Sequence, residues 1–216
     1  MPTAAETVLK LAEQQGILRT VDLAPLSVPR VTLTRLVRSG RIERIGRGLY
    51  SLPGADVSEH HSLVEASKRV THGVVCLLSA LRFHDLTTQD PFEVWIAIDR
   101  RARKPKVAYP PLRVVRFSRN ALRDGVEHYE IEKSNVPVTS PARTVADCFR
   151  YRTKIGLDVA IEALRDYLKR SRNPGPGGRK SQGAHTSGAF TIDALVDAAE
   201  SVKAYGVLRP YLEALS

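Results

Sequence analysis

The chain has 216 residues, of which 43% are hydrophobic, so it can bury a core as one large domain or as two small ones. Its 33 Lys and Arg residues against 23 Asp and Glu residues give a formal net charge of +10. Such a charge suggests a polyanionic partner, either nucleic acid or an anionic membrane surface, and is equally compatible with a soluble protein that happens to be basic. No apolar run approaches the roughly 18 residues of a membrane span, and the N-terminus lacks a signal-peptide pattern. We therefore expect a cytoplasmic protein without a membrane partner.

Three short helices and a hairpin are predicted for the first quarter of the chain. The apolar residues of "AAETVLKLAEQQG" share one helical face, which Gly16 closes, and "TVDLAPL" is a second short helix. Ser27 is expected to cap a third helix, "VPRVTLTRLVRSG", with Pro29 in its first turn. Two extended pieces, "RIERI" and "GLYSL", follow on either side of a glycine turn. This order predicts a winged helix-turn-helix in residues 1–54, with the third helix in the DNA major groove.

Arginines are concentrated on the third predicted helix and on the hairpin. Leu33 and Leu36 are expected to face the core, which leaves a polar face on the opposite side of that helix. The first hairpin strand is expected to carry Arg41 and Arg44, with Arg47 at the turn. Arginine pairs bidentately with guanine or with phosphate, which suits DNA contact, although a basic face for an acidic protein is the alternative. The predicted DNA-contacting residues are Arg30, Thr32, Thr34, Arg35, Arg38, Arg41, Arg44 and Arg47.

A C-terminal mixed α/β domain, an α+β unit with a small sheet, is predicted for residues 55–216. Strands are expected in "PFEVWIAID", "PLRVVRFS", "VEHYEIEK" and "VPVTS". Helices are expected in "SEHHSLVEASKRV", capped by Ser58, and in "VVCLLSALRFHDL", "SPARTVADCFRY" and "GLDVAIEALRDYLKR". The segment "GVVCLL" taken alone could instead be a strand. Residues 171–189 are rich in Gly, Ser and Pro and are expected to form a mobile loop, after which one or two helices close the chain.

Two pairs of residues in this unit have specific expected environments. Arg143 and Asp147 lie four residues apart on a predicted helix, so we expect an ion pair that supports the helix. Cys76 and Cys148 sit in apolar patterns without metal-binding spacing, so we expect buried free thiols in a reducing compartment.

A second basic patch is predicted in the loop between the first two of these strands. It consists of Arg100, Arg101, Arg103, Lys104 and Lys106. An ordinary solvated loop is one interpretation of this patch. The other is a second contact, with DNA phosphates, with RNA or with an acidic partner.

Motifs for catalysis, metal binding or phosphate binding are not found, so no cofactor and no metal are expected. His60 and His61 are adjacent and cannot share a helical face, which favours exposed helix residues over metal ligands. His84 lies in an apolar stretch and is expected to be partly buried with a hydrogen-bond partner.

The alternative function is an enzyme, a metal-dependent nuclease or phosphotransferase, and it rests on three carboxylates near one predicted strand. Asp90, Glu93 and Asp99 surround "PFEVWIAID", and carboxylates beside a strand can bind magnesium. None of the lysines has an acidic residue two positions before it, which counts against the common nuclease arrangement. We therefore expect a binding protein and not an enzyme.

Several segments resemble the AbiEi-type antitoxins, the transcriptional regulators of type IV toxin–antitoxin systems. The hairpin segment "RIGRGLYSL" is similar to the end of the opening domain of that family. The segments "LLSALRFHDLT", "PFEVWIAIDR" and "VPVTSPARTVADCFRYR" resemble its second domain. The resemblance covers almost the whole chain apart from residues 171–189.

The resemblance implies a protein encoded beside a nucleotidyltransferase-like toxin. Such a protein represses its own operon by binding double-stranded DNA through the winged helix, and its C-terminal domain counters the toxin directly or indirectly. By motif position, the implied DNA contacts are Arg30, Thr34, Arg35, Arg38 and Arg47. The resemblance implies no enzymatic activity, and neither it nor the sequence indicates an operator or an oligomeric state.

Overall fold

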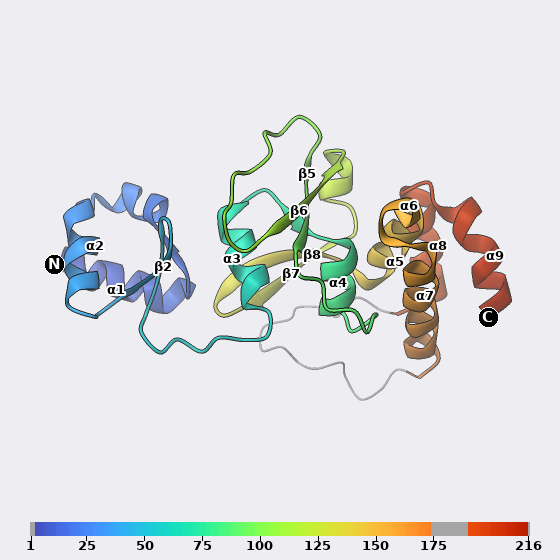
Figure 1. Cartoon of the computed structure of the whole chain (residues 1–216), viewed down its shortest axis with the longest axis horizontal. Helices are drawn as coiled ribbons and strands as arrows, with labels where there is room; N and C mark the ends of the chain where they lie inside the picture. The colour runs from blue at the N-terminus through green and yellow to red at the C-terminus, as the bar shows by residue number, and fades with distance from the viewer. Residues whose placement is uncertain (1–2, 174–189, 216) are drawn as a thin grey trace.

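Helices occupy both ends of the molecule and a sheet occupies its middle. The computed structural model describes residues 3–173 and 190–215 and arranges them in a row from the N-terminal helices to the C-terminal helices (Figure 1). The class is α+β, as the sequence predicts. Within these two ranges, no helix is both long enough and apolar enough to span a bilayer.

The N-terminal helices follow the predicted order. α1 (Ala4–Gln15) begins with a capping box, in which the Thr3 hydroxyl accepts a bond from the Glu6 amide at 3.3 Å and the Glu6 carboxylate accepts one from the Thr3 amide at 2.8 Å. It ends at Gly16, whose φ of +64° lies in the region that glycine tolerates best. The second helix, η1 (Thr20–Leu26), is a 3-10 helix.

α2 (Arg30–Arg38) begins without the predicted cap. Ser27 has a left-handed backbone with a φ of 52° and lies too early to cap the helix. Pro29 occupies the N-cap position, because its φ of −62° and extended ψ lead directly into the first turn. The prediction of Ser27 as the cap is therefore wrong.

The hairpin forms at the predicted residues. β2 (Glu43–Gly46) and β3 (Leu49–Ser51) pair antiparallel, and the turn between them contains Gly48 with a φ of +74°. β1 (Leu18–Arg19) pairs with the other edge of β3, which gives a three-stranded sheet of order β1-β3-β2. The sequence does not reveal β1, because a strand of two residues carries no alternation.

The central sheet has five strands in the order β6-β5-β4-β8-β7. Their bounds are β4 (Val74–Val75), β5 (Val94–Asp99), β6 (Leu112–Phe117), β7 (Val126–Ile131) and β8 (Ser134–Thr139). β5–β6 and β4–β8 are parallel, whereas β4–β5 and β7–β8 are antiparallel, so the prediction of a mixed sheet is confirmed. The four strands predicted from the sequence are present. The additional strand, β4, lies at the start of a segment predicted as one helix.

Helices flank this sheet and extend beyond it. Their bounds are α3 (His61–Arg69), α4 (Leu77–Phe83), α5 (Pro141–Arg150), α6 (Arg152–Ile155), α7 (Leu157–Arg172), α8 (Ile192–Ser201) and α9 (Tyr205–Leu215), with a 3-10 turn, η2 (Asn120–Leu122). Ser58 is not the cap of α3, because the helix begins only at His61 and Ser58 binds Glu132 instead. The predicted loop 171–189 starts too early, since α7 continues through Arg172, and its residues 174–189 lie outside the described part.

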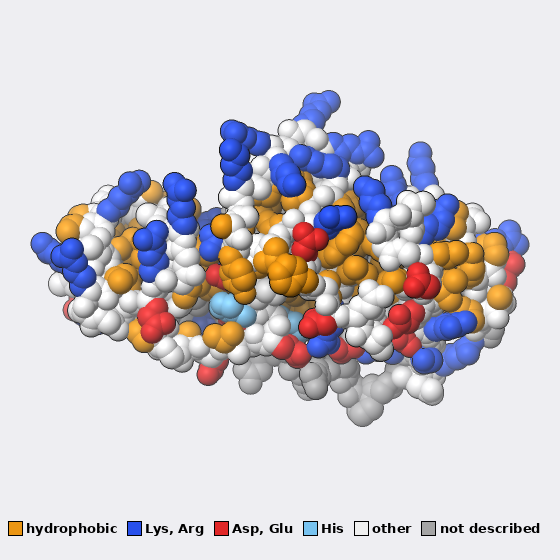
Figure 2. Space-filling model, viewed as in Figure 1, with side chains coloured by type: hydrophobic (Ala, Val, Ile, Leu, Met, Phe, Trp, Pro, Cys, Tyr) orange, Lys and Arg blue, Asp and Glu red, His pale blue; other side chains and the backbone are white. Residues whose placement is uncertain are grey.

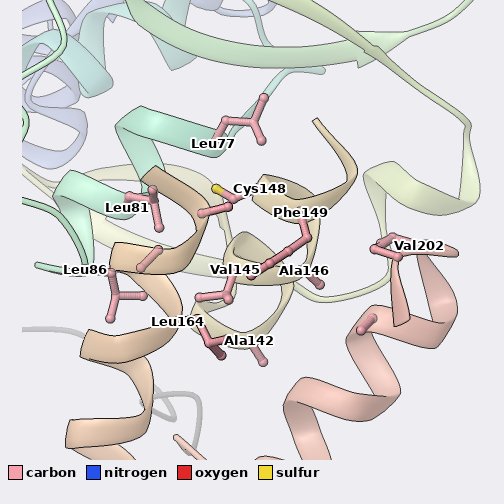
Figure 3. Close-up of a cluster of buried hydrophobic side chains, with 14 of the residues drawn as sticks. Leu77, Leu81, Leu86, Ala142, Val145, Ala146, Cys148, Phe149, Leu164 and Val202 are labelled. Atoms are coloured by element: carbon pink, nitrogen blue, oxygen red, sulfur yellow. The ribbon is translucent and has the colours of Figure 1, made fainter. Parts of the chain in front are cut away.

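Two apolar clusters cover the central sheet. The larger one joins β5 and β6 to α4, α5, α7, α8 and α9, and Figure 3 shows Phe149, Val145 and Leu164 within it. Cys76 and Cys148 belong to this cluster as buried free thiols, as predicted. The smaller cluster joins β7 and β8 to α3, and it also contains Ile17 and Leu49 from the N-terminal segment.

Candidate nucleic-acid interface

The outer face of α2 is polar and exposed. Leu33 and Leu36 on its inner face are 3% and 4% exposed and pack with α1, as the spacing predicts. The exposed residues of the outer face are Arg30, Thr34, Arg35 and Arg38. Thr32, the remaining predicted contact on this helix, is half-buried, so its side chain is the least available of the set.

The hairpin carries three further exposed arginines. Arg44 lies in β2 and Arg47 lies in the turn, as predicted. Arg41 precedes β2, because the strand starts only at Glu43, and the prediction that placed Arg41 on the strand is wrong. The turn is anchored by a hydrogen bond from the Thr20 amide to the Gly48 carbonyl at 3.0 Å.

The arginines of this region have no carboxylate partner. Within residues 3–173 and 190–215, none of the six arginines of α2 and the hairpin forms an ion pair. One acidic residue, Glu43, lies among them in the sequence. Figure 2 shows basic side chains standing out over α2 and β2 at the N-terminal end of the molecule. We call α2 and the hairpin, residues 30–51, the basic reading surface.

The basic reading surface is fixed to the central sheet. Besides the apolar contact of Ile17 and Leu49, the carbonyl of Gln15 accepts hydrogen bonds from Ser134 Oγ at 2.8 Å and from Lys68 Nζ at 3.3 Å. Gly16 lies so close to the turn between β7 and β8 that a Cβ there would stand 2.0 Å from the carbonyl oxygen of Glu132. These contacts hold the N-terminal helices against the sheet.

The second basic patch lies in the loop between β5 and β6. All five of its predicted residues, Arg100, Arg101, Arg103, Lys104 and Lys106, are exposed. The loop is held at its start by a hydrogen bond from the Arg101 amide to Asp99 Oδ1 at 2.8 Å. Figure 2 shows basic side chains along the upper edge of the central part, on the face that also displays those of α2 and β2.

The carboxylates of the enzymatic alternative do not converge. Asp90 and Glu93 precede β5 and pair with arginines, Asp90 with Arg82 at 3.8 Å and Glu93 with Arg113 at 3.9 Å. Asp99 is the last residue of β5 and therefore lies at the opposite end of a six-residue strand, roughly 17 Å away. Among the described residues, no group of three His, Cys, Asp or Glu residues could hold a metal ion.

The histidines take structural positions. His60 and His61 are half-buried, so the prediction of exposed side chains is wrong: the His60 ring contacts the Phe83 ring in a tilted arrangement, and His61 Nδ1 lies 2.8 Å from Glu132 Oε2. His84 is buried, and its Nε2 donates to the Thr139 carbonyl at 2.7 Å, which confirms a satisfied histidine. Burial lowers the pKa of His84 to about 4.

The predicted ion pair of α5 is present and deeply buried. Arg143 Nε donates to Asp147 Oδ2 at 2.9 Å, and the two side chains are 4% and 2% exposed. Arg143 also donates to the Asp124 carbonyl at 2.7 Å, which ties α5 to the turn before β7. Because the pair links two segments inside the core, it is more than the surface helix support that the spacing predicts.

Comparison with known proteins supports a regulator. The family model described as "Transcriptional regulator, AbiEi antitoxin" matches residues 6–53, so the resemblance seen in the sequence is confirmed over this range. A crystal structure of the RV2827C protein from Mycobacterium tuberculosis has a similar fold, with a TM-score of 0.52 and 15% sequence identity over 99% of this chain and 82% of that chain. No curated protein sequence matches the chain significantly.

Proposed function

We propose that the chain is a DNA-binding repressor of its own operon and the antitoxin of a toxin–antitoxin pair. In this proposal residues 1–54 form a winged helix-turn-helix, α2 enters the major groove, and the β2–β3 hairpin is the wing. The observation that carries the proposal is the set of exposed arginines on α2 and the hairpin, which have no carboxylate partner among the residues that the structure describes. The regulator family whose model matches residues 6–53 supports the same function.

The positions of the arginines suit two kinds of DNA contact, one with bases and one with phosphates. Arg35 lies on the exposed face of a helix narrow enough for the major groove, where an arginine side chain can pair bidentately with guanine. Arg44 and Arg47 project from a hairpin and would contact the backbone beside the groove. The second basic patch would add phosphate contacts farther along the duplex.

The test is binding of the whole chain to DNA from upstream of its own gene and to scrambled DNA, over a salt series. If four to six arginines meet phosphates, log affinity falls with log salt at a slope of about −4 to −5. Arg35→Ala should weaken binding to the upstream DNA by about 1–3 kcal/mol and relax the preference at one base position. Arg165→Ala, which removes an exposed arginine from α7, is the matched control.

Two outcomes would overturn this assignment. Equal weakening of Arg35→Ala on both DNAs would reassign that side chain from base reading to phosphate contact. The absence of any DNA binding would leave the basic reading surface as a site for an acidic protein.

The antitoxin half of the proposal requires a separate measurement. We propose that the C-terminal domain counters a nucleotidyltransferase-like toxin encoded beside this gene, and that the chain itself is not an enzyme. Co-expression of the whole chain with the neighbouring gene product should restore growth, and Arg35→Ala should restore it equally, because that residue acts on DNA. Continued toxicity in the presence of the wild-type chain would remove the antitoxin role.

A further inference from the structure

A second cluster of arginines surrounds a small hollow at the far end of β5 and β6. The parallel register pairs Asp99 with Phe117, so the residues that follow them, Arg100 and Ser118, lie at the same edge of the sheet. The end of α5 closes this edge. The hollow has a volume of about 30 Å³. We call it the arginine hollow, and the polar residues that line it are Arg100, Arg116, Ser118, Arg143, Asp147, Arg150 and Tyr151.

Backbone carbonyls hold two of these arginines in place. Arg116 NH1 donates to the Asp99 carbonyl at 2.9 Å and also to the Ala102 carbonyl. Arg150 NH1 donates to the Val202 carbonyl at 2.5 Å. Each guanidinium is thereby anchored through one nitrogen, and its other two nitrogens have no acceptor among the described residues. Anchored donors lose less conformational freedom when they bind a ligand.

Positive charge in the arginine hollow is not balanced. In the described part of the chain, Arg100, Arg116 and Arg150 form no ion pair, and the Arg100 side chain makes no hydrogen bond. The carboxylate of Asp147 lies in the floor, where Arg143 already binds it. Arg100 and Arg150 therefore have no ion-pair partner among the described residues, although the Asp147 carboxylate is near enough to Arg150 to attract it.

The size of the hollow restricts what it can hold. On the scale of this volume one water molecule needs roughly 10–15 Å³, so the hollow accommodates about two water-sized atoms, such as two oxygens of a phosphate group, but not a sugar or a base. A guanidinium binds two such oxygens through parallel N–H donors. The rest of the ligand must lie outside, and there the second basic patch begins at Arg100 itself.

We propose that the arginine hollow binds a phosphate group of a polynucleotide backbone, which then continues along the second basic patch. Arg100 and Arg150 donate to the phosphate oxygens. The identity of the polynucleotide as double-stranded DNA rests on the proposed function, whereas the phosphate chemistry of the hollow does not.

Arg100→Gln is the substitution that tests this proposal with the least effect on the fold, because its side chain is exposed and unbonded. Binding of the whole chain to duplex DNA should lose about one unit of salt slope, and affinity should fall roughly five- to tenfold at 0.1 M salt. The loss should be equal on upstream and scrambled DNA, since a phosphate contact carries no sequence information. Arg165→Gln, with the same charge change on α7, should leave the slope unchanged.

Inorganic phosphate provides the second probe. Titration of the whole chain, followed by amide NMR shifts, should move the signals of Arg100, Ser118 and Tyr151 in the wild type and in Arg165→Gln, but not in Arg100→Gln. Unchanged DNA binding in Arg100→Gln overturns the proposal, and phosphate shifts in that case would identify a site for free phosphate only. The two proposals can be separated. If the wild-type chain binds upstream and scrambled DNA equally but Arg100→Gln still lowers the salt slope, the proposal of a repressor is contradicted and the proposal of a phosphate site in the arginine hollow is supported.

Discussion

A pair of hollows beside the central sheet, both in the described part of the chain, contain arginines, and they differ in what surrounds the arginine. The first, which we call the acidic hollow, has a volume of about 200 Å³ and is lined by residues that include Glu59, His60, Arg82 and Asp90. Arg82 lies within 3.8 Å of Glu59 and of Asp90, and within 3.6 Å of Asp85. The arginine hollow is much smaller, and the arginines on its rim have no such neighbours among the described residues.

This difference shows that the sequence positions of basic residues do not by themselves locate a positive surface. Arg82 and Arg150 are each the last or second-last residue of a short helix, and nothing in their immediate sequence separates them. The distinction arises from segments distant in the sequence, because Glu59 and Asp90 fold back onto Arg82 while a carbonyl of Val202 holds Arg150. Only the Arg82 charge is thereby neutralised by neighbouring carboxylates.

The largest effect on stability is expected from removing Arg143, which lies in the floor of the arginine hollow. Arg143→Met leaves the carboxylate of Asp147 buried without its partner, which should lower the free energy of unfolding by about 3–5 kcal/mol. Urea unfolding of the whole chain measures this loss, and Arg165→Met, on an exposed surface, should change stability by less than about 0.5 kcal/mol. A loss below about 1 kcal/mol for Arg143→Met would mean that the buried pair does not hold α5 in place.

A smaller effect is expected behind the acidic hollow, where Phe83 separates the hollow from His84. The folded pKa of His84 is about 4, against 6.5 for the unfolded chain, and burial is the main cause. As the pH falls below 6.5, the unfolded chain takes up a proton that the folded chain does not, so stability decreases. The decrease from this residue should be about 2 kcal/mol between pH 6.5 and pH 5.

The His84 prediction is checked by urea unfolding at both pH values, with His84→Gln as the comparison. Glutamine can still donate to the Thr139 carbonyl but does not titrate, so the variant should lose less stability on acidification than the wild type. Equal losses in both proteins would show that His84 titrates with a nearly normal pKa in the folded state.

Regular elements were predictable because local patterns determine them. The alternation in "VWIAID" and the Ser140–Pro141 start of α5 predicted β5 and α5 correctly. The Ser27 cap failed because both Ser27 and Pro29 suit a helix start, and only the three-dimensional path of the chain decides between them. β4 lies in "GVVCLL", for which helix and strand were both open, because two residues carry no period that separates them.

The candidate site was predictable only in part, because local patterns reveal some of its residues and the tertiary fold assembles the others. The exposed arginines of α2 and the hairpin follow from helical spacing and from the glycine turn, so seven of the eight predicted residues are exposed and Thr32 alone is half-buried. The arginine hollow could not be predicted, because Arg100 follows β5, Arg116 lies in β6 and Arg150 ends α5, and only the tertiary fold brings them together. No local period links residues so far apart in the chain.

The smallest effect is expected for Arg82, and it tests the comparison most directly. The Arg82 side chain is 42% exposed and its ion pairs are long, so Arg82→Gln should change the free energy of unfolding by less than about 1 kcal/mol. Because nearby carboxylates neutralise its charge, the same variant should keep the wild-type salt slope of DNA binding, whereas Arg100→Gln should lose about one unit. Both variants replace an arginine by glutamine and so remove the same charge. Any difference between their salt slopes therefore comes from the residues that surround each arginine. Equal slopes in both variants would mean that the DNA senses the net charge of the domain and does not contact the arginine hollow.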